Sequence, residues 1–203
     1  MLKFFLKHFF LLISFVWITS CAVQTVDSSK YIKYLSNPQN GLEQSVRSNE
    51  YQFSLRFLPA DLLALREQES RGFSQKTFED TKKNFDDLIY FSLSIVDTER
   101  GMDLVKKFST DSLRSAKATQ YFSFDMAQHI YLVQGGDTIG CTLFNYDRNY
   151  GVSPENNFSL AFKHKKNSDS DLQIIYEDRV LNCGIIRFSI KQQDIIKIPS
   201  VKI

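Results

Sequence analysis

Short segments in which large apolar and polar residues alternate limit most strongly what this 203-residue chain can fold into. The clearest examples are residues 51–57, 89–96 and 158–162. A period of two places every second side chain on the same face of a strand, so each segment predicts a strand with one buried and one solvent-facing side. Aromatic residues make up 14% of the chain, which favours a packed, sheet-containing interior over disorder.

The second half of the chain predicts one strand after another. Residues 129–134 and 138–146 flank Gly135-Gly136-Asp137, and glycines that can adopt positive φ between two alternating runs indicate a hairpin. The other strands expected here are 172–176, 184–190 and an edge strand at 195–198. Short strands separated by regular turns are typical of an antiparallel sheet or a small sandwich.

Helices are expected mainly in the first half. Pro59 ends the first strand and suits the entry to a short helix, and Ser74 is typical of the N-cap of a second helix that contains Phe78. A weaker helix is expected at 102–108, and 109–119 is interpreted as a surface connection or an exposed helix. We therefore expect an α+β fold, with an N-terminal strand and two or three helices packed on a mostly antiparallel sheet or small β-sandwich in the C-terminal half.

The first residues have the pattern of an export signal. Lys3 and Lys7 precede the run 9–18, which is apolar except for one serine, and Ile-Thr-Ser then leads to Cys21. This pattern resembles the bacterial lipobox, which implies that Cys21 becomes the diacylated first residue of the mature protein. The alternative is an uncleaved membrane-spanning helix, but a span needs about 20 apolar residues and Lys7 with His8 leaves only about ten.

The expected layout is a signal peptide at 1–20, a lipidated cysteine and polar tether at 21–48, and a single α+β domain at 49–203. The chain has 25 Lys plus Arg and 23 Asp plus Glu, and removal of Lys3 and Lys7 with the signal leaves 23 of each. A neutral domain lacks the basic surface that nucleic acid or anionic lipid would need, so we expect no nucleic-acid partner. Membrane attachment is then expected to come from the acyl chains on Cys21.

Two cysteines remain after lipidation, Cys141 and Cys183. In an oxidising envelope compartment they are a candidate disulfide that would close a loop of about 40 residues. The alternative is two buried thiols that pack as small apolar groups.

Residues with a recognisable catalytic or metal-binding pattern are scarce. The mature region has two histidines, His129 and His164, and neither lies in a hydrolase motif or at the spacing of a zinc site. We predict no catalytic residue, no metal site and no cofactor.

The aromatic segment near residue 147 is a candidate interface. Phe144, Tyr146, Arg148 and Tyr150 alternate with Asn and Asp, and aromatic and arginine side chains are the anchors that interfaces favour. The alternative is that Phe144 or Tyr146 faces the core and the rest is a loop.

Two longer segments carry a resemblance to a protein family. Residues 131–151, with the core Val-Gln-Gly-Gly-Asp-Thr-Ile-Gly-Cys, and residues 57–63, Phe-Leu-Pro-Ala-Asp-Leu-Leu, are similar to uncharacterised lipoproteins of Bacteroidetes-type bacteria. The resemblance extends over most of the mature region. It implies an envelope lipoprotein and assigns no catalytic residues.

We therefore expect a lipid-anchored, non-enzymatic protein that binds or helps to assemble another envelope protein or component. Ala22 stands where an aspartate retains lipoproteins in the inner membrane of enteric bacteria, which favours the outer membrane, with the domain in the periplasm or on the cell surface. One alternative is a hydrolase of glycan or lipid, which needs two converging carboxylates. The other is a carrier of a small apolar ligand, which needs a cavity of about several hundred cubic ångströms.

Overall fold

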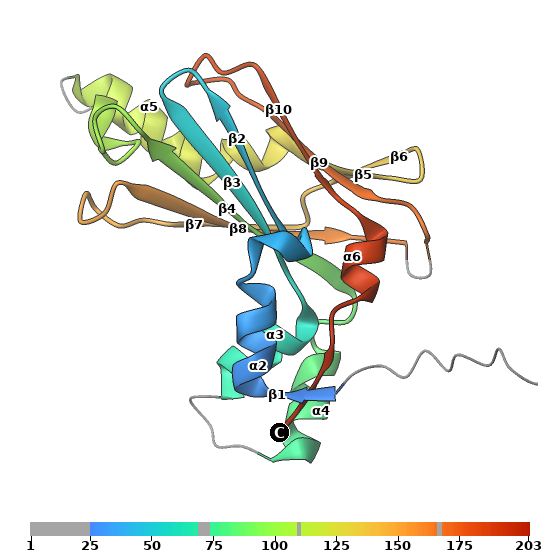
Figure 1. Ribbon diagram of the computed structural model, residues 1–203. Coiled ribbons are helices and arrows are strands. Elements are labelled where there is room, and N and C mark those ends of the chain that lie inside the picture. Colours follow the sequence, from blue (N-terminus) through green and yellow to red (C-terminus); the bar gives the residue numbers. More distant parts are fainter. Residues whose placement is uncertain (1–24, 69–73, 109–110, 166–167) are drawn as a thin grey trace, which may run out of the picture.

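Two antiparallel sheets face each other and form the larger part of the molecule, and a smaller body of helices extends from one end (Figure 1). The computed structural model describes residues 25–68, 74–108, 111–165 and 168–203. Helices lie mainly in the first half of the described chain and strands dominate the second half. The expected α+β class is confirmed.

The larger sheet has five strands, and all its neighbouring strands are antiparallel. In spatial order they are β2 (Glu43–Ser48), β3 (Tyr51–Leu58), β4 (Leu88–Asp97), β8 (Glu155–Lys163) and β7 (Leu143–Asp147). The register places Phe53 opposite Ile95, and Leu93 opposite Phe158. Each of these side chains is buried, so the alternation in the sequence corresponds to one inward and one outward face.

The second sheet has four antiparallel strands, β10 (Ile185–Ile190), β9 (Leu172–Glu177), β5 (Ile130–Gln134) and β6 (Asp137–Gly140). Gly135 and Gly136 join β5 to β6 with φ of 58° and 87°, as the expected hairpin requires. The expected single strand at 138–146 is instead divided between the two sheets. After β6, which pairs with β5, the chain crosses to the other sheet and continues as β7 at the edge of β8. The amide of Thr142 makes the first bond to β8, donating to Ala161 O at 2.7 Å.

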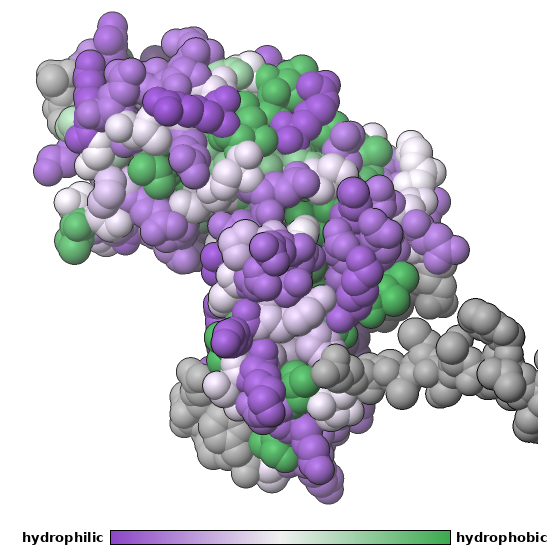
Figure 2. Space-filling model, viewed as in Figure 1, coloured by the Kyte–Doolittle hydropathy of each residue, from purple (hydrophilic) through white to green (hydrophobic). Residues whose placement is uncertain are grey.

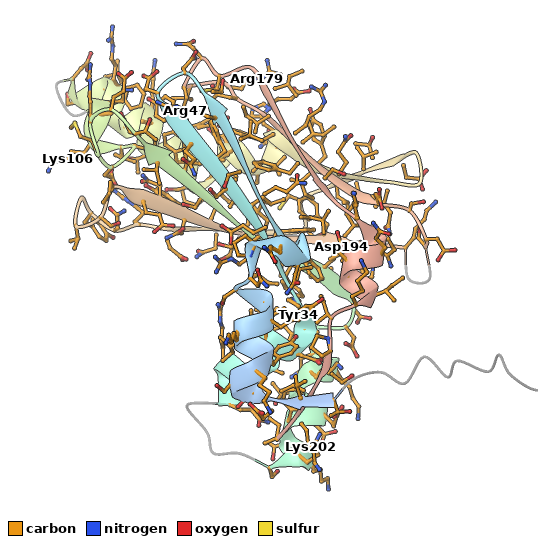
Figure 3. All side chains as sticks on the ribbon, in the orientation of Figure 1. Tyr34, Arg47, Lys106, Arg179, Asp194 and Lys202 are labelled. Atoms are coloured by element: carbon orange, nitrogen blue, oxygen red, sulfur yellow. The ribbon has the colours of Figure 1, made fainter. Side chains whose placement is uncertain are left out.

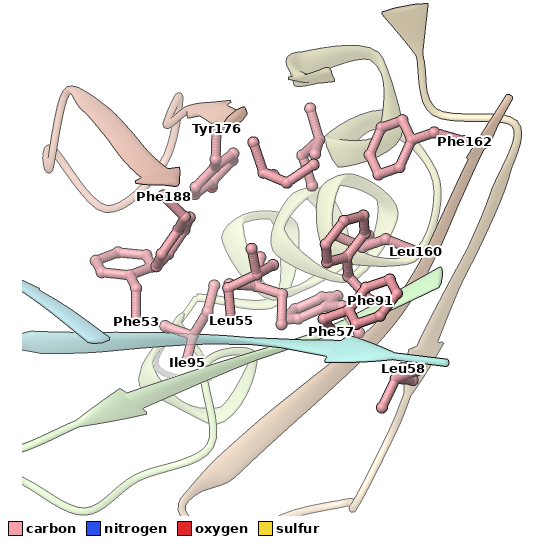
Figure 4. Packing of buried hydrophobic residues seen from close by; sticks show 14 of the residues in the cluster. Phe53, Leu55, Phe57, Leu58, Phe91, Ile95, Leu160, Phe162, Tyr176 and Phe188 are labelled. Atoms are coloured by element: carbon pink, nitrogen blue, oxygen red, sulfur yellow. The ribbon is translucent and has the colours of Figure 1, made fainter. Parts of the chain in front are cut away.

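The core lies between the two sheets. Phe53 of β3 packs against Tyr176 of β9, with ring centroids 6.1 Å apart, and Figure 4 shows Phe188 beside them. The sheets also meet along β2 and β10, where the amide of Ser189 donates to Gln44 Oε1 at 2.7 Å. The helix α5 (Ser112–Ser123) packs Phe122 against the inner side of β8.

The helical body contains α2 (Ser28–Leu35), α3 (Ala60–Gln68), α4 (Gln75–Lys83) and a parallel pair of β1 (Thr25–Asp27) with β11 (Ser200–Lys202). Tyr31 of α2 is fully buried. Tyr34 lies where this body meets the sandwich (Figure 3), and its carbonyl accepts from Asn40 Nδ2 at 2.7 Å. Residues 25–48 therefore belong to the folded part, which corrects the expected tether, because the buried side chains of α2 outweigh the polar average of the segment.

Several expected boundaries are also confirmed or corrected. Ser74 caps α4 by accepting from the amide of Thr77 at 3.2 Å, as expected. For residues 109–119 the sequence allows either a surface connection or an exposed helix, and from Ser112 onward the segment forms the helix α5, capped by Asp111. The expected edge strand at 195–198 is wrong. The remaining short elements are α6 (Gln192–Ile196) and the 3₁₀ helices η2 (Pro38–Asn40), η3 (Lys106–Phe108) and η4 (Asp125–His129), of which η3 is all that forms of the helix expected at 102–108.

Candidate functional site

The outward face of the five-stranded sheet is the candidate site, and we call it the open face. It consists of the side chains that alternate with the buried ones on β2, β3, β4, β8 and β7. The register aligns them in rows that cross the strands. One row is Ser45, Ser54, Ser94, Asn157 and Asp147, and the next is Glu43, Arg56, Ser92, Ser159 and Asn145.

Hydrogen bonds between neighbours hold the polar rows in place. The hydroxyl groups of Ser45 and Ser54 are 2.7 Å apart, and Ser94 donates to Glu155 Oε1 at 2.9 Å. Asn145 Nδ2 donates to Asp147 Oδ1 at 2.6 Å. These contacts cross from strand to strand or run along one strand, so they order the side chains before any ligand arrives.

One ion pair lies within the same surface. Arg56 Nη2 is 2.6 Å from Glu43 Oε2, and Arg56 Nε donates to the same oxygen at 2.8 Å. Both side chains are partly exposed, so the pair contributes at most about 1 kcal/mol to folding. Its main consequence is to fix the direction of a guanidinium group on the open face.

The polar rows border a hollow of about 410 Å³, which we call the polar hollow. Hydroxyl, amide and charged side chains from β3, β4 and β8 line most of it, and Arg66 of α3 closes the side next to the helical body. Arg47 lies at the far end of β2 (Figure 3), where it donates to Thr98 Oγ1 at 3.4 Å. Figure 2 shows that hydrophilic residues predominate on the side of the molecule in view.

The end of the open face next to the helical body is apolar. The register aligns Leu58, Tyr90, Ala161 and Leu143 in one row there. Figure 4 shows Leu58 on the opposite side of β3 from Phe57, although Leu58 is itself buried and belongs to the same apolar cluster. With Leu63 of α3, this row borders a pocket of about 380 Å³, which we call the apolar pocket.

Arg66 lines both the polar hollow and the apolar pocket. Its side chain is exposed, and no hydrogen bond or ion pair links it to another residue in the described part of the chain. Leu58 and Ser159 also line both, so the two depressions adjoin along the strands. The open face thus offers apolar, cationic and hydroxyl groups in sequence.

A further cavity of about 450 Å³ lies between the end of the sandwich and the helices. Phe57, Ile89 and Leu172 are among its apolar lining residues. Gln134 closes one side through reciprocal hydrogen bonds with the backbone of Lys165, at 3.4 and 2.9 Å. His164, Lys165 and Ser168 also line this cavity. Residues 166–167 between them lie outside the described ranges.

The candidate interface on β7 is divided by strand alternation. Tyr146 is buried and stacks on Phe158 with centroids 4.7 Å apart, and Phe144 also packs toward Phe158. Arg148 and Tyr150 lie in the exposed turn that follows, with the guanidinium carbon 4.9 Å from the tyrosine ring. The four residues therefore do not form one surface, and the alternative of a core strand followed by a loop is confirmed.

Cys141 and Cys183 are both free, partly buried thiols, so the candidate disulfide does not form and the alternative of two separate thiols holds. Cys141 lies against β8, where its Sγ contacts Ala161 O, and Cys183 lies at the end of β2, where its Sγ contacts Ser48 O. Three strand spacings of about 4.8 Å separate β8 from β2, far more than the roughly 7 Å between Cα atoms that a disulfide allows. Burial raises the pKa of both thiols, so they stay protonated at neutral pH. Cys21 lies outside the described residues.

Sequence reasoning missed a charged cluster at the far end of the sandwich. Asp97 is only 1% exposed and accepts from the amides of Glu99 and Arg100 at 3.1 and 2.9 Å. Lys107 Nζ is 2.7 Å from Glu50 Oε1, 3.4 Å from Asp97 Oδ2, and also bonds Tyr51 OH. Burial of Asp97 raises its pKa, but these amides and Lys107 outweigh it, so the net pKa is lowered. The cluster attaches the loop after β4 to the sheet.

Within the described ranges, no three His, Cys, Asp or Glu side chains are grouped so that they could hold a metal ion. The helices of the same ranges are all too short or too polar to cross a membrane. His129 stacks on Tyr121, with ring centroids 6.0 Å apart.

Comparison with known proteins adds little to this picture. No protein-family model and no curated protein sequence matches the chain. Among solved structures it is similar to the crystal structure of a DUF4426 family protein from Pseudomonas aeruginosa, with 9% sequence identity and a TM-score of 0.36. The alignment covers 73% of this chain and 92% of that one. A similarity at this level has no bearing on function.

Proposed function

We propose that this protein is a lipid-anchored component of the bacterial cell envelope whose open face binds another envelope component. The observation that carries the binding role is the open face itself, which has an ordered polar hollow next to an apolar pocket. Binding sites commonly combine an apolar lining with a few directed polar groups in volumes of about 300 to 1,000 Å³. The lipobox pattern that ends at Cys21 supports the anchor and the envelope location.

A non-enzymatic role fits the carboxylates around the polar hollow. Glu43 is paired with Arg56, Glu155 accepts from Ser94, and Asp147 accepts from Asn145. Acid and base groups of a hydrolase must be directed at the substrate. These three carboxylates are directed at their neighbours, which favours recognition.

A carrier of an apolar ligand is the second candidate function, and the apolar pocket favours it. Leu143 is 54% exposed at this pocket, so an apolar surface is offered to solvent. Exposed apolar patches bordered by polar residues are typical of interaction sites and ligand-binding grooves.

The binding role is tested by photo-crosslinking in the cells that make the protein. A photoactivatable amino acid replaces Ser159, which is exposed on the open face, and in a matched variant it replaces Ser189, which is exposed on β10 of the other sheet. We expect a discrete crosslinked product from position 159 and none from position 189. Equal products from both positions, or none from either, would refute binding at the open face.

The anchor is tested separately. Cys21→Ser should leave an unprocessed precursor that takes up no labelled palmitate. Normal processing and release of that variant would refute the lipid anchor and leave the open-face result unaffected.

A further inference from the structure

The apolar pocket and the polar hollow form one amphipathic track along the strands. Leu58, Leu63 and Leu143 border its apolar end, Arg66 stands at the junction, and serine hydroxyl groups follow. Consecutive rows of the open face are about 6.6 Å apart, because side chains on one face of a strand repeat every two residues. The track is therefore ordered as an amphiphile is, with an apolar part, a charged junction and a polar head.

The charge at the junction selects the ligand. Arg66 is exposed and is not paired with any residue of the described ranges, whereas Arg56, on the neighbouring row, is held by Glu43. A guanidinium group binds phosphate through paired hydrogen bonds. A phosphate joined to an acyl chain through glycerol would reach Arg66 while the chain fills the apolar pocket.

The position of the chain start places this track near the bilayer. The first described residue, Thr25, lies in β1 of the helical body, and only three residues separate it from Cys21. Four residue steps span at most about 14 Å, so a lipidated Cys21 would hold the helical body at the membrane surface. The helix α3 of that body supplies Leu63 and Arg66, so the apolar pocket opens at the membrane-proximal end of the sheet.

We propose that the open face binds a membrane phospholipid, with an acyl chain in the apolar pocket, the phosphate on Arg66 and the remainder of the head over the polar hollow. This inference rests on the proposed function, because it names the envelope component that the open face binds. A pocket of about 380 Å³ holds only part of one chain, so the lipid is partly withdrawn from the bilayer and not enclosed.

The test uses the full lipidated chain in nanodiscs of a galactolipid that contains no phosphate. Two photoactivatable probes carry the same diazirine-bearing acyl chain, one as phosphatidic acid and one as diacylglycerol. Labelled peptides are identified by mass spectrometry. We expect phosphatidic acid to label residues 58–66 and 143–145 about tenfold more than diacylglycerol, since one charge-assisted interaction is lost in the second probe.

Matched variants separate the two halves of the track. Arg66→Gln should remove the preference for phosphatidic acid, whereas Arg187→Gln, an exposed arginine on β10, should leave it intact. Leu143→Asp should lower labelling by both probes, whereas Ile185→Asp, at a similarly exposed position on β10, should not. Melting temperatures of all four variants show that each is folded.

Three outcomes would overturn the phospholipid inference: equal labelling by the two probes, labelling outside the apolar pocket only, or equal losses in the test and control variants. If the protein's own acyl chains filled the apolar pocket, the probes would label only residues outside it. If position 159 captures a protein or glycan while the lipid probes fail, the phospholipid inference falls and the proposed binding role stands. If position 159 captures nothing, the proposed function itself falls.

Discussion

The two faces of the five-stranded sheet are made from the same strands and have opposite chemistry. On the inner face, Phe53, Phe91, Phe158 and their neighbours are almost completely buried. On the open face, the residues one position away are serine, asparagine, glutamate and arginine, with an apolar row only beside the helical body. Stability is therefore carried by one set of alternate residues and the proposed recognition by the other, so substitutions at adjacent positions should separate them.

The largest effect is expected on the inner face of β8. Phe158→Ala removes a ring that packs on Phe122, Phe144 and Tyr146, and should lower the free energy of unfolding by about 3 to 5 kcal/mol. Ser159→Ala, one residue away on the open face, should change it by less than about 0.5 kcal/mol. Urea denaturation of both variants measures the contrast. Similar losses would show that the two faces are not energetically separate.

The next effect concerns Asn156, a fully buried polar residue on the inner face of β8. Its Oδ1 accepts from Tyr146 OH at 2.7 Å and from the amide of Leu104 at 3.3 Å. Asn156→Leu leaves both donors buried without this acceptor, so a loss of about 2 to 3 kcal/mol is expected. The control is Asn157→Leu on the open face, which should cost far less in the same denaturation experiment.

A pH-dependent effect is expected at the far end of the sandwich. The pKa of Asp97 is lowered from 3.8, so its ionised form stabilises the fold fully above that value, and the contribution is lost as pH falls through the folded-state pKa. Thermal unfolding should show stability falling below about pH 4. The Asp97→Asn variant should be less stable at neutral pH, and its stability should change less with pH in this acidic range. If the variant loses stability with falling pH as steeply as the original protein, Asp97 is not the group responsible.

The smallest effect is expected for the ion pair on the open face. A double-mutant cycle of Arg56→Gln with Glu43→Gln should give a coupling energy below about 1 kcal/mol, because both groups are partly exposed. A larger coupling would mean that the open face contributes to folding, which would weaken the separation between the two faces.

The strand pattern could be predicted because it is local. Residues 51–57, 89–96 and 158–162 alternate in sequence and form β3, β4 and β8. The helix α2 could not be predicted in the same way, since its segment is polar on average and only Tyr31 and Leu35 are buried. Its stability comes from packing in the helical body, whose members α3, α4 and β11 lie far along the chain.

The candidate site could not be predicted from the sequence for a related reason. Ser54, Ser94 and Asn157 are isolated polar residues in three separate strands and carry no motif. They become neighbours only through the order β3-β4-β8 and its register. The sequence places Tyr146 in a candidate interface, but the phase of β7 turns it inward onto Phe158.

By itself, the sequence predicted most of the longer strands and which of their sides is buried, because each depends on residues adjacent in the chain. For the same reason it predicts an export and lipidation signal that ends at Cys21. The tertiary structure alone decided that the chain between β6 and β7 passes from one sheet to the other, that Cys141 and Cys183 stay apart, and that Arg66 stands where the polar and apolar parts of the open face meet. Strand order and register follow from packing over the whole core, which no local pattern encodes.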